Sequence, residues 1–313
     1  MKAVVYQKQN KHHKLIYKDI DTPIVKDDEV LIKVYSSSIN AADYRSMQMR
    51  IIPKNKIFGA DVAGVVIEIG KNCHTFKPGD EVMGDISGSG FGGFAEYVSV
   101  KENSLILKPK NISFIDAATI PLACITAYQS LIKKGKLKAY QNVLIYGAGG
   151  GVGNFTVQIA HFLKADVTAF CGPSNLELVK TLGASKVFNY QNKPLKNHTG
   201  KYDLILAVNG KQKLTTYKRL LNKNGRLVVV GGALSQLFKT MVLGPFLSIG
   251  KKKITFLIGK PNQNDLLYIT TLVSQGYIKP VIEKVIPLNQ VPVMMDYTRK
   301  GHVKGKIVVD ILS

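Results

Sequence analysis

The sequence predicts an α/β protein in which a doubly wound parallel sheet accompanies a separate, mostly β unit. Short strand patterns punctuated by turns fill the first part of the chain, whereas helical patterns alternate with short apolar runs from about residue 121 onward. Alternation of the second kind indicates parallel strands joined by crossover helices. We therefore expect a mostly β unit over residues 1–120, a doubly wound unit over 121–258, and a last segment, 259–313, that completes the doubly wound unit and returns to the mostly β one.

The individual elements follow in order along the chain. The mostly β unit carries strand patterns at 1–6, 29–35, 62–69 and 94–100. Turn residues separate these strands, as in Lys77-Pro78-Gly79-Asp80 and in a run rich in glycine at 88–93. The doubly wound unit carries apolar strands at 142–146, 166–170, 186–189, 203–208, 226–230 and 254–258. A helix over 267–275 then precedes strands at 281–286 and 306–311.

Residues 146–153 read YGAGGGVG, a glycine-rich turn between an apolar strand and a helical pattern. A strand, a glycine turn and a helix in this order present backbone N–H groups and the positive end of the helix to an anion, usually the pyrophosphate of a dinucleotide. We expect Gly149, Gly150, Gly151 and Val152 to contact this group. A glycine turn that binds no ligand is the alternative.

The end of the next strand predicts which nicotinamide cofactor the chain binds. A fingerprint that prefers NAD carries Asp or Glu about 20 residues beyond the glycines, where the carboxylate binds the ribose 2′-hydroxyl. Residues 170–175 read FCGPSN instead and contain no acid. A carboxylate would repel a 2′-phosphate, so its absence favours NADP(H), with Gly172, Ser174 and Asn175 at the phosphate.

The composition is strongly basic, with 43 Lys and Arg against 21 Asp and Glu and a net charge of +22. This charge creates a positive field that attracts anions. Lysines cluster at 133–138 and 251–253, but no recognised nucleic-acid motif or interleaved aromatic residue accompanies them. We interpret these lysines as solvated surface residues, and expect weak, salt-sensitive association with anionic surfaces but no specific binding of nucleic acid.

Cysteine usage and hydropathy indicate a cytoplasmic protein. The chain has three cysteines, Cys73, Cys124 and Cys171, which are too few and too far apart for a disulfide framework or a clustered zinc site. Its first residues turn polar too soon for a secretory signal. The longest stretch without acidic or basic residues, 139–163, contains the clustered glycines and several amides, so no transmembrane segment is expected.

Three segments together resemble one family. They are FGADVAGVV at 58–66, ATIPLACITAYQSL at 118–131 and IYGAGGGVGNFTVQIA at 145–160. In this combination the chain resembles the medium-chain dehydrogenase/reductases, and specifically their zinc-independent quinone oxidoreductase branch, which includes the chloroplast-envelope quinone oxidoreductase homologues. The resemblance implies a GroES-like substrate domain, a Rossmann domain, an active site in the cleft between them, and a homodimer.

The resemblance also identifies the positions at which zinc-dependent members of the superfamily hold their metal. Those positions carry Asn40, Ala60 and Leu122 in this chain, and Asp61 matches the glutamate beside the ligand histidine. Catalytic zinc needs three protein ligands and an open position. None of the three usual ligands is present, so we expect no catalytic metal.

Five side chains are candidates for the site, three of them through a match to the family pattern. Asn40 and Thr126 match residues near the nicotinamide, and Tyr190 matches a tyrosine at the 2′-phosphate. Tyr44 and Arg45 are the candidate hydrogen-bond donors to the substrate oxygen. Three of them have a structural alternative: Tyr44 as an aromatic cleft wall, Arg45 as a solvated charge, and Tyr190 as a packing aromatic. Relatives usually have Lys or Arg where this chain has Ser174 or Asn175, so any preference for NADPH is expected to be modest.

Two functions remain open at this point. The first is an NADPH-dependent reductase that transfers hydride to an apolar quinone or to the β-carbon of an enone, a reaction that needs hydrogen-bond donors in a dry site. The apolar segment 234–253 matches a region that lines an acyl-chain pocket in relatives, although an ordinary core helix would have the same pattern. The second is a binding protein that keeps the fold, with vestigial reductase activity, and uses its basic surface for nucleic acid or membrane.

Overall fold

The computed structural model describes residues 1–9, 12–208, 210, 212–232, 234–248, 250–301 and 303–312. The chain forms two compact units. The first unit comprises Met1–Ile125, Lys260–Gly276 and Ile282–Ser313, and the second comprises Thr126–Gly259 and Tyr277–Val281. Among the described residues, no helix is both long and apolar enough to cross a membrane.

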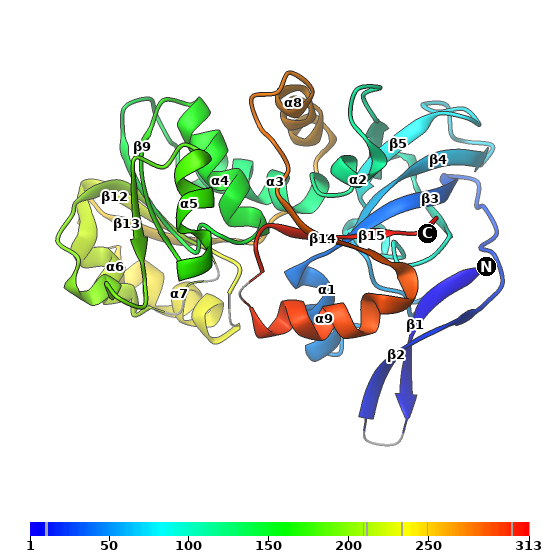
Figure 1. Ribbon diagram of the computed structural model, residues 1–313, viewed down its shortest axis with the longest axis horizontal. Helices are drawn as coiled ribbons and strands as arrows, with labels where there is room; N and C mark the ends of the chain where they lie inside the picture. The colour runs from blue at the N-terminus through cyan, green and yellow to red at the C-terminus, as the bar shows by residue number, and fades with distance from the viewer. Residues whose placement is uncertain are drawn as a thin grey trace. The chain divides into compact units, whose positions relative to one another are not determined.

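The first unit is built on a mixed, seven-stranded sheet with the order β14–β15–β3–β4–β5–β7, in which β6 also pairs with β3 (Figure 1). Its strands are β3 (Glu29–Ile39), β4 (Asp61–Ile69), β5 (Glu81–Asp85), β6 (Tyr97–Lys101), β7 (Leu105–Leu107), β14 (Ile282–Pro287) and β15 (Lys306–Asp310). Only β14 and β15 are parallel, and the other pairs are antiparallel. Val30, Ile32 and Val34 of β3 are fully buried in the core of this unit.

Helices and a hairpin complete the first unit. A two-stranded hairpin, β1 (Lys2–Gln9) and β2 (His12–Asp19), projects from its sheet (Figure 1). The helices are α1 (Ala41–Gln48), α2 (Phe114–Ala117), α8 (Gln263–Ser274) and α9 (Val291–Lys300), with short turns η1 (Ser87–Ser89), η2 (Glu102–Ser104) and η6 (Leu288–Gln290). Helix α3 (Pro121–Tyr128) contains the junction between the units.

The second unit is a six-stranded parallel sheet with the order β10–β9–β8–β11–β12–β13. Its strands are β8 (Asn142–Tyr146), β9 (Asp166–Cys171), β10 (Lys186–Asn189), β11 (Tyr202–Val208), β12 (Leu221–Val230) and β13 (Lys253–Leu257). The connecting helices are η3 (Gln129–Lys134, a π-helical turn), α4 (Gly151–Phe162), η4 (Pro173–Asn175), α5 (Leu176–Thr181), η5 (Leu195–Asn197), α6 (Leu214–Leu220) and α7 (Leu234–Leu247).

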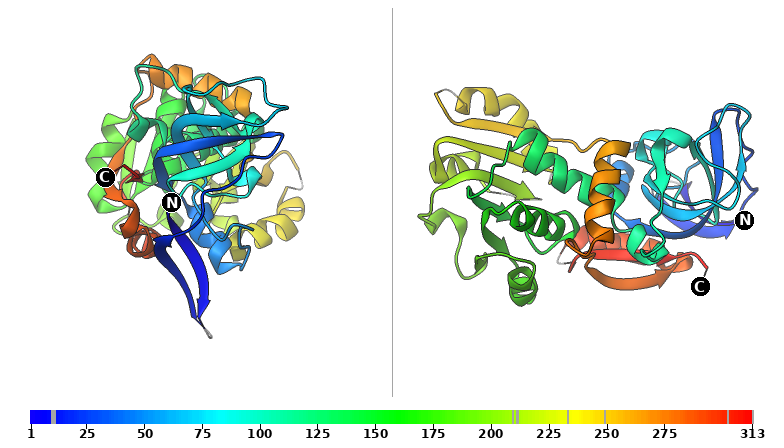
Figure 2. Two further views of the ribbon diagram at one scale, coloured as in Figure 1. Left: turned by 90° about the vertical axis from the view of Figure 1, so that its right-hand side faces the viewer. Right: turned by 90° about the horizontal axis from the view of Figure 1, so that it is seen from above.

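The parallel sheet is covered by helices on both of its faces (Figure 2). Val143, Leu144 and Ile145 in β8 are fully buried, as expected for a strand that has helices on either side. The order of the strands reverses between β8 and β11, which makes this the point where ligands bind in doubly wound folds. The predicted fold class, a doubly wound parallel sheet with a separate, mostly β unit, is confirmed.

Candidate functional site

The glycine turn that follows β8 is packed so tightly that side chains are excluded at two of its positions. Gly147 has a φ of +90°, and a Cβ added there would lie 2.0 Å from the carbonyl oxygen of Val208. A Cβ at Gly153 would lie 2.2 Å from the carbonyl oxygen of Gly147. Gly150 differs, because a Cβ there would meet no atom within 4 Å. The turn is therefore closed against the sheet and open at Gly150.

Helix α4 begins at this open position. Gly150 is the N-cap residue, and the carbonyl oxygen of Gly150 accepts the first helical hydrogen bond from the backbone N–H of Asn154 at 2.8 Å. The N–H groups of the first turn of a helix have no acceptor within the helix, and the helix dipole places partial positive charge beside them. The opening at Gly150 can therefore receive an anion.

Asn175 lies directly against the glycine turn. A Cβ at Gly149 would lie 2.6 Å from Cγ of Asn175, so the two residues are in close contact. The side chain of Asn175 is buried, and its Oδ1 has no hydrogen-bond partner among the described residues. A buried amide oxygen without a partner is costly. Asn175 therefore presents an unused acceptor beside the position that an anion would occupy.

Three more of the predicted residues lie where β9 ends. Gly172 follows β9, and a Cβ there would lie 3.1 Å from the hydroxyl oxygen of Tyr190. Ser174 is exposed in η4. The ring of Tyr190 packs against the ring of Tyr146 with a centroid distance of 6.1 Å, so Tyr190 has a packing role as well as a hydroxyl next to Gly172. Gly172 and Tyr190 thus lie together at the end of β9, and Gly149 and Asn175 lie together at the glycine turn.

Thr126, the last of the residues predicted in the second unit, lies in α3. It is half-buried, and its Oγ1 faces Gly259, where an added Cβ would lie only 2.5 Å away. A side chain at position 259 would therefore collide with the hydroxyl group of Thr126 unless one of the two moved. The predicted role of Thr126 at the nicotinamide stays a prediction.

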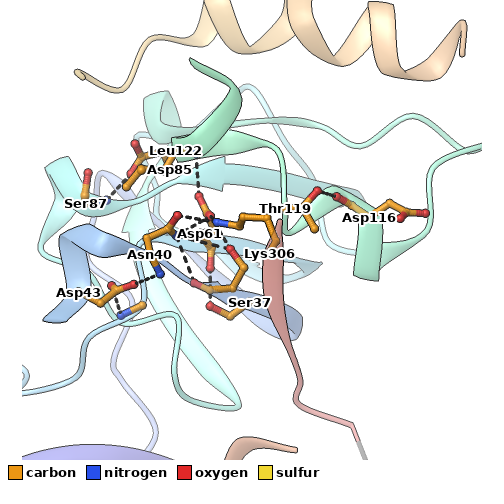
Figure 3. A network of polar contacts seen from close by, with 12 residues as sticks. Ser37, Asn40, Asp43, Asp61, Asp85, Ser87, Asp116, Thr119, Leu122 and Lys306 are labelled. Carbon is orange, nitrogen blue, oxygen red and sulfur yellow. Dashed lines mark hydrogen bonds and ion pairs between the residues drawn. The ribbon is translucent and has the colours of Figure 1, made fainter. Parts of the chain in front are cut away.

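In the first unit, Asn40 is held in a buried polar network (Figure 3). Its Nδ2 donates to Oδ2 of Asp61 at 2.7 Å and to the carbonyl oxygen of Ser38 at 3.2 Å. Its Oδ1 accepts from Nζ of Lys306 at 2.5 Å. Its backbone N–H donates to Oδ2 of Asp43 at 2.7 Å, at the start of α1. Both amide hydrogens of Asn40 are thus committed to protein acceptors.

Asp61 and Lys306 form a buried ion pair at the centre of this network. Nζ of Lys306 lies 3.3 Å from Oδ2 of Asp61, and the two side chains are 3% and 0% exposed. The Asp61 carboxylate also accepts from Oγ of Ser38 at 2.6 Å and from the backbone N–H of Leu122 at 2.8 Å. The sequence analysis did not identify Lys306. Its only local signal was a lysine that precedes the apolar residues of its strand.

Two further buried carboxyl groups belong to the same region (Figure 3). Asp43 accepts from the backbone N–H groups of Asn40 and Gly59, and Asp85 accepts from the backbone N–H of Ser87. Burial, together with the negative charge of Asp61, raises the pKa of Asp43 and the pKa of Asp85 to about 7 each. Near neutral pH, this cluster therefore holds protons that ordinary carboxyl groups would have lost.

The positions that match the ligands of zinc-dependent relatives offer few metal ligands here. Asn40 contributes an amide that is already bonded, Ala60 is a buried methyl group, and Leu122 contributes only a backbone N–H to Asp61. The cation next to Asn40 and Asp61 is the ammonium group of Lys306. Within the described ranges, no group of three or more His, Cys, Asp or Glu side chains is arranged to hold a metal ion.

Tyr44 and Arg45 lie on α1, close to this network. Tyr44 is only 9% exposed and belongs to the apolar core of the first unit. The guanidinium group of Arg45 lies over the ring of Tyr44, 5.6 Å from its centroid. This environment suits an aromatic wall residue, which was the structural alternative for Tyr44. Its role as a hydrogen-bond donor stays a prediction.

Helix α7 covers most of the apolar segment 234–253, in which Ile249 lies outside the described residues. One side of this helix is not a core face, since Phe238 and Phe246 are 62% and 69% exposed. Met241, Val242 and Leu243 are exposed as well. An ordinary core helix does not expose so many large apolar side chains. The predicted part of this segment in lining a substrate pocket stays a prediction.

Comparison with known proteins agrees with this architecture. The family described as "Alcohol dehydrogenase GroES-like domain" matches residues 26–110, and "Zinc-binding dehydrogenase" matches residues 182–309. The chain is 31% identical over 305 residues to "Chloroplast envelope quinone oxidoreductase homolog" of Arabidopsis thaliana, covering 93% of this chain and 92% of that protein.

Two other proteins extend the comparison. "NADPH-dependent alkenal/one oxidoreductase, chloroplastic" of Arabidopsis thaliana is 30% identical over 305 residues, which cover 93% of this chain and 74% of that protein. The solved structure of the quinone oxidoreductase from Coxiella burnetii superposes with a TM-score of 0.87 at 27% identity, covering 99% of each chain. The relatives resemble the chain over nearly its whole length.

Proposed function

The chain belongs to the quinone oxidoreductase branch of the medium-chain dehydrogenase/reductase superfamily, and we propose that it is a zinc-free, NADPH-dependent reductase of an apolar quinone or α,β-unsaturated carbonyl. The observation that carries the proposal is the open glycine turn with the unpaired Oδ1 of Asn175 beside it. One relative is named a quinone oxidoreductase homolog and another an NADPH-dependent alkenal/one oxidoreductase, and both names support the proposal.

The residues of the second unit fit a phosphorylated dinucleotide. The N-terminus of α4 would bind the pyrophosphate, because its first N–H groups point to the opening at Gly150. Asn175 would pair its unused oxygen with a hydroxyl group of the nearer ribose. Gly172, the exposed Ser174 and the hydroxyl of Tyr190 lie beyond Cys171, at the end of the strand where NAD-binding folds carry an acid, and they support the proposal. Hydroxyl groups there can donate hydrogen bonds to a 2′-phosphate, which a carboxylate would repel.

When bound, the reduced nicotinamide supplies a hydride, and the protein orients the substrate and stabilises the charge that develops on its oxygen. Asn40 is a weak candidate for that second task, because Asp61 and Ser38 already take both of its amide hydrogens. We assign the task to Tyr44 or Arg45 on the adjoining helix and interpret Asn40 as a fixed wall. Aromatic and apolar walls would exclude water during the transfer.

The proposal also states that no zinc takes part. Donor chemistry supports this, because the matching positions supply a bonded amide, a methyl group and a backbone N–H, and a lysine cation is paired with Asp61. Full activity should therefore survive exhaustive chelation, and elemental analysis should find no stoichiometric zinc. About one zinc per chain, lost together with activity, would refute the zinc-free part of the proposal.

The test of the whole proposal is turnover. Oxidation of NADPH, followed by its absorbance, should be accelerated by the purified chain when quinones or enones of increasing apolar size are supplied. Activity should be higher with NADPH than with NADH at equal subsaturating concentrations. No turnover with any member of either substrate class would refute the proposal and favour the binding-protein alternative.

A further inference from the structure

The second unit carries a basic concavity that has no part in the proposed reaction. It has a volume of about 360 Å³. Its lining residues include five lysines and arginines, Lys133, Lys134, Lys136, Arg226 and Lys253, and no Asp or Glu. The two lysine clusters that the sequence shows, more than 100 residues apart, thus meet at one place together with an arginine that belongs to neither cluster.

Packing of the sheet explains why these residues converge. Helical turn η3 packs against β12 and β13, which brings the lysines at its end to these strands. Arg226 of β12 is paired in register with Lys253, the first residue of β13. Because paired residues of adjacent strands lie about 5 Å apart, the two cationic side chains are held side by side by backbone hydrogen bonds.

Three of these cationic side chains have no carboxylate partner in the part of the chain that the structure describes. Among the described residues, Lys134, Lys136 and Arg226 form no ion pair. The acid nearest in the sheet is Asp203 on β11, and its oxygens accept from the backbone N–H of Asn142 and from the side chain of Asn222. Like charges gathered without counter-charge repel one another, so the arrangement costs stability unless an anion occupies it.

The concavity lies at the opposite end of the strands from the glycine turn. Arg226 is level with Leu204 of β11, and Leu204 is level with Val143 near the start of β8. The glycine turn begins after Tyr146, at the other end of β8. In a parallel sheet, these two ends open on opposite edges, so one ligand of dinucleotide size bound at the turn leaves the concavity free.

We propose that this concavity binds a small anion that carries at least two phosphate groups. A single phosphate group brings at most about two negative charges, whereas five cations line the site. Arg226 can bind two oxygens of one phosphate group, and lysines can bind the others as point charges. The volume is at the lower end of the range for small-molecule sites, roughly 300–1,000 Å³, which fits a compact ligand rather than a polymer.

Calorimetric titration of inorganic pyrophosphate into the full chain tests the proposal, at constant ionic strength and with NADPH saturating the glycine turn. One saturable site is expected. The double variant Lys134→Gln, Arg226→Gln should weaken it at least about tenfold, because charge-assisted hydrogen bonds to phosphate are lost. The control Lys180→Gln, Lys186→Gln removes the same charge at exposed positions, the second on the far edge strand β10, and should change affinity less than about twofold.

Three outcomes would overturn the proposal. Equal weakening in both double variants would show only a general attraction to the net charge. If NADPH abolishes the binding of pyrophosphate and the double variant Lys134→Gln, Arg226→Gln leaves it unchanged, pyrophosphate binds at the glycine turn. Binding to phosphatidylglycerol vesicles or to RNA without binding of pyrophosphate would make the surface an interface for a larger partner.

Two controls separate this proposal from folding and from the proposed function. The variant Lys134→Arg keeps the charge and should retain binding in an otherwise native chain, and melting curves establish that each variant is folded. The pyrophosphate affinities of the variants should also be compared without NADPH. The order of these affinities should stay the same even if the chain binds no nicotinamide cofactor, because the concavity does not depend on the reductase reaction.

Discussion

Replacing Lys306 by methionine would remove the positive charge from the buried network of the first unit. Methionine keeps the length and apolar stem of lysine, so the change is mainly the loss of the ammonium group. Asp61, which is fully buried, would lose its ion pair, and Oδ1 of Asn40 would lose its donor. Removing one partner of a buried ion pair typically costs about 3–5 kcal/mol. An unpaired buried amide oxygen adds about 1–3 kcal/mol.

The expected loss in Lys306→Met is therefore several kcal/mol, a large part of the roughly 5–15 kcal/mol by which domains are stable. Urea unfolding followed by far-UV circular dichroism measures it, and hydrogen exchange shows whether the loss is concentrated in β15 and β3. The double variant Lys306→Met, Asp61→Asn removes both charges and should lose less than Lys306→Met alone, since no buried charge is left unpaired. A Lys306→Met protein within about 1 kcal/mol of the parent would refute the ion-pair reasoning.

Three further predictions concern cofactor choice, catalysis and pH. Ser174→Asp puts a carboxylate where the 2′-phosphate is expected and should weaken NADPH at least about tenfold while sparing NADH, by fluorescence titration; equal loss for both would contradict the assignment. If the Tyr44 hydroxyl donates to the substrate oxygen, Tyr44→Phe should lower kcat and kcat/KM together, by roughly a hundredfold; an unchanged kcat on both a quinone and an enone would leave Tyr44 as cleft wall. The pKa values of Asp43 and Asp85 are raised from 3.8 to about 7, so between these pH values the folded state binds more protons than the unfolded state. The free energy of unfolding should therefore fall as pH rises from about 4 to about 7. Asp85→Asn should flatten this fall in urea unfolding series, and an identical slope in the variant would argue against a raised pKa.

Much of the fold was predictable because most of the parallel strands contain a short apolar run. The predicted strands at 142–146 and 186–189 have the observed bounds of β8 and β10. The predicted helix over 267–275 in fact begins at Gln263, because Oδ1 of Asn262 caps it by accepting from the backbone N–H of Asp265 at 2.9 Å. That cap is a local signal and was visible in the sequence. The domain boundaries, the homodimer and the cytoplasmic location stay predictions. The names of two relatives place those proteins in the chloroplast.

The polar network could not be predicted from local patterns. Lys306 is 266 positions from Asn40 and 245 from Asp61, so only the pairing of β15 with β3 brings them together. The same holds for the basic concavity, where the packing of η3 against β12 and β13 brings together lysine clusters that are separate in the sequence. Sequence patterns give the face and type of an element, whereas sites of this kind depend on which strands become neighbours.

The charge balance of the buried network bears on the proposal that the reaction uses no zinc. Three carboxyl groups are buried there, those of Asp43, Asp61 and Asp85, but only one buried ammonium group, that of Lys306, is paired with them. With the pKa of Asp43 and that of Asp85 raised to about 7, both are partly protonated near neutral pH, and Asp61 is balanced by Lys306. A divalent cation would have to displace the ammonium group and find ligands that Ala60 and Leu122 do not provide. At pH 7 the network therefore carries about one net negative charge without a metal, instead of the two expected from ordinary carboxyl groups, and this supports the proposal that no zinc takes part.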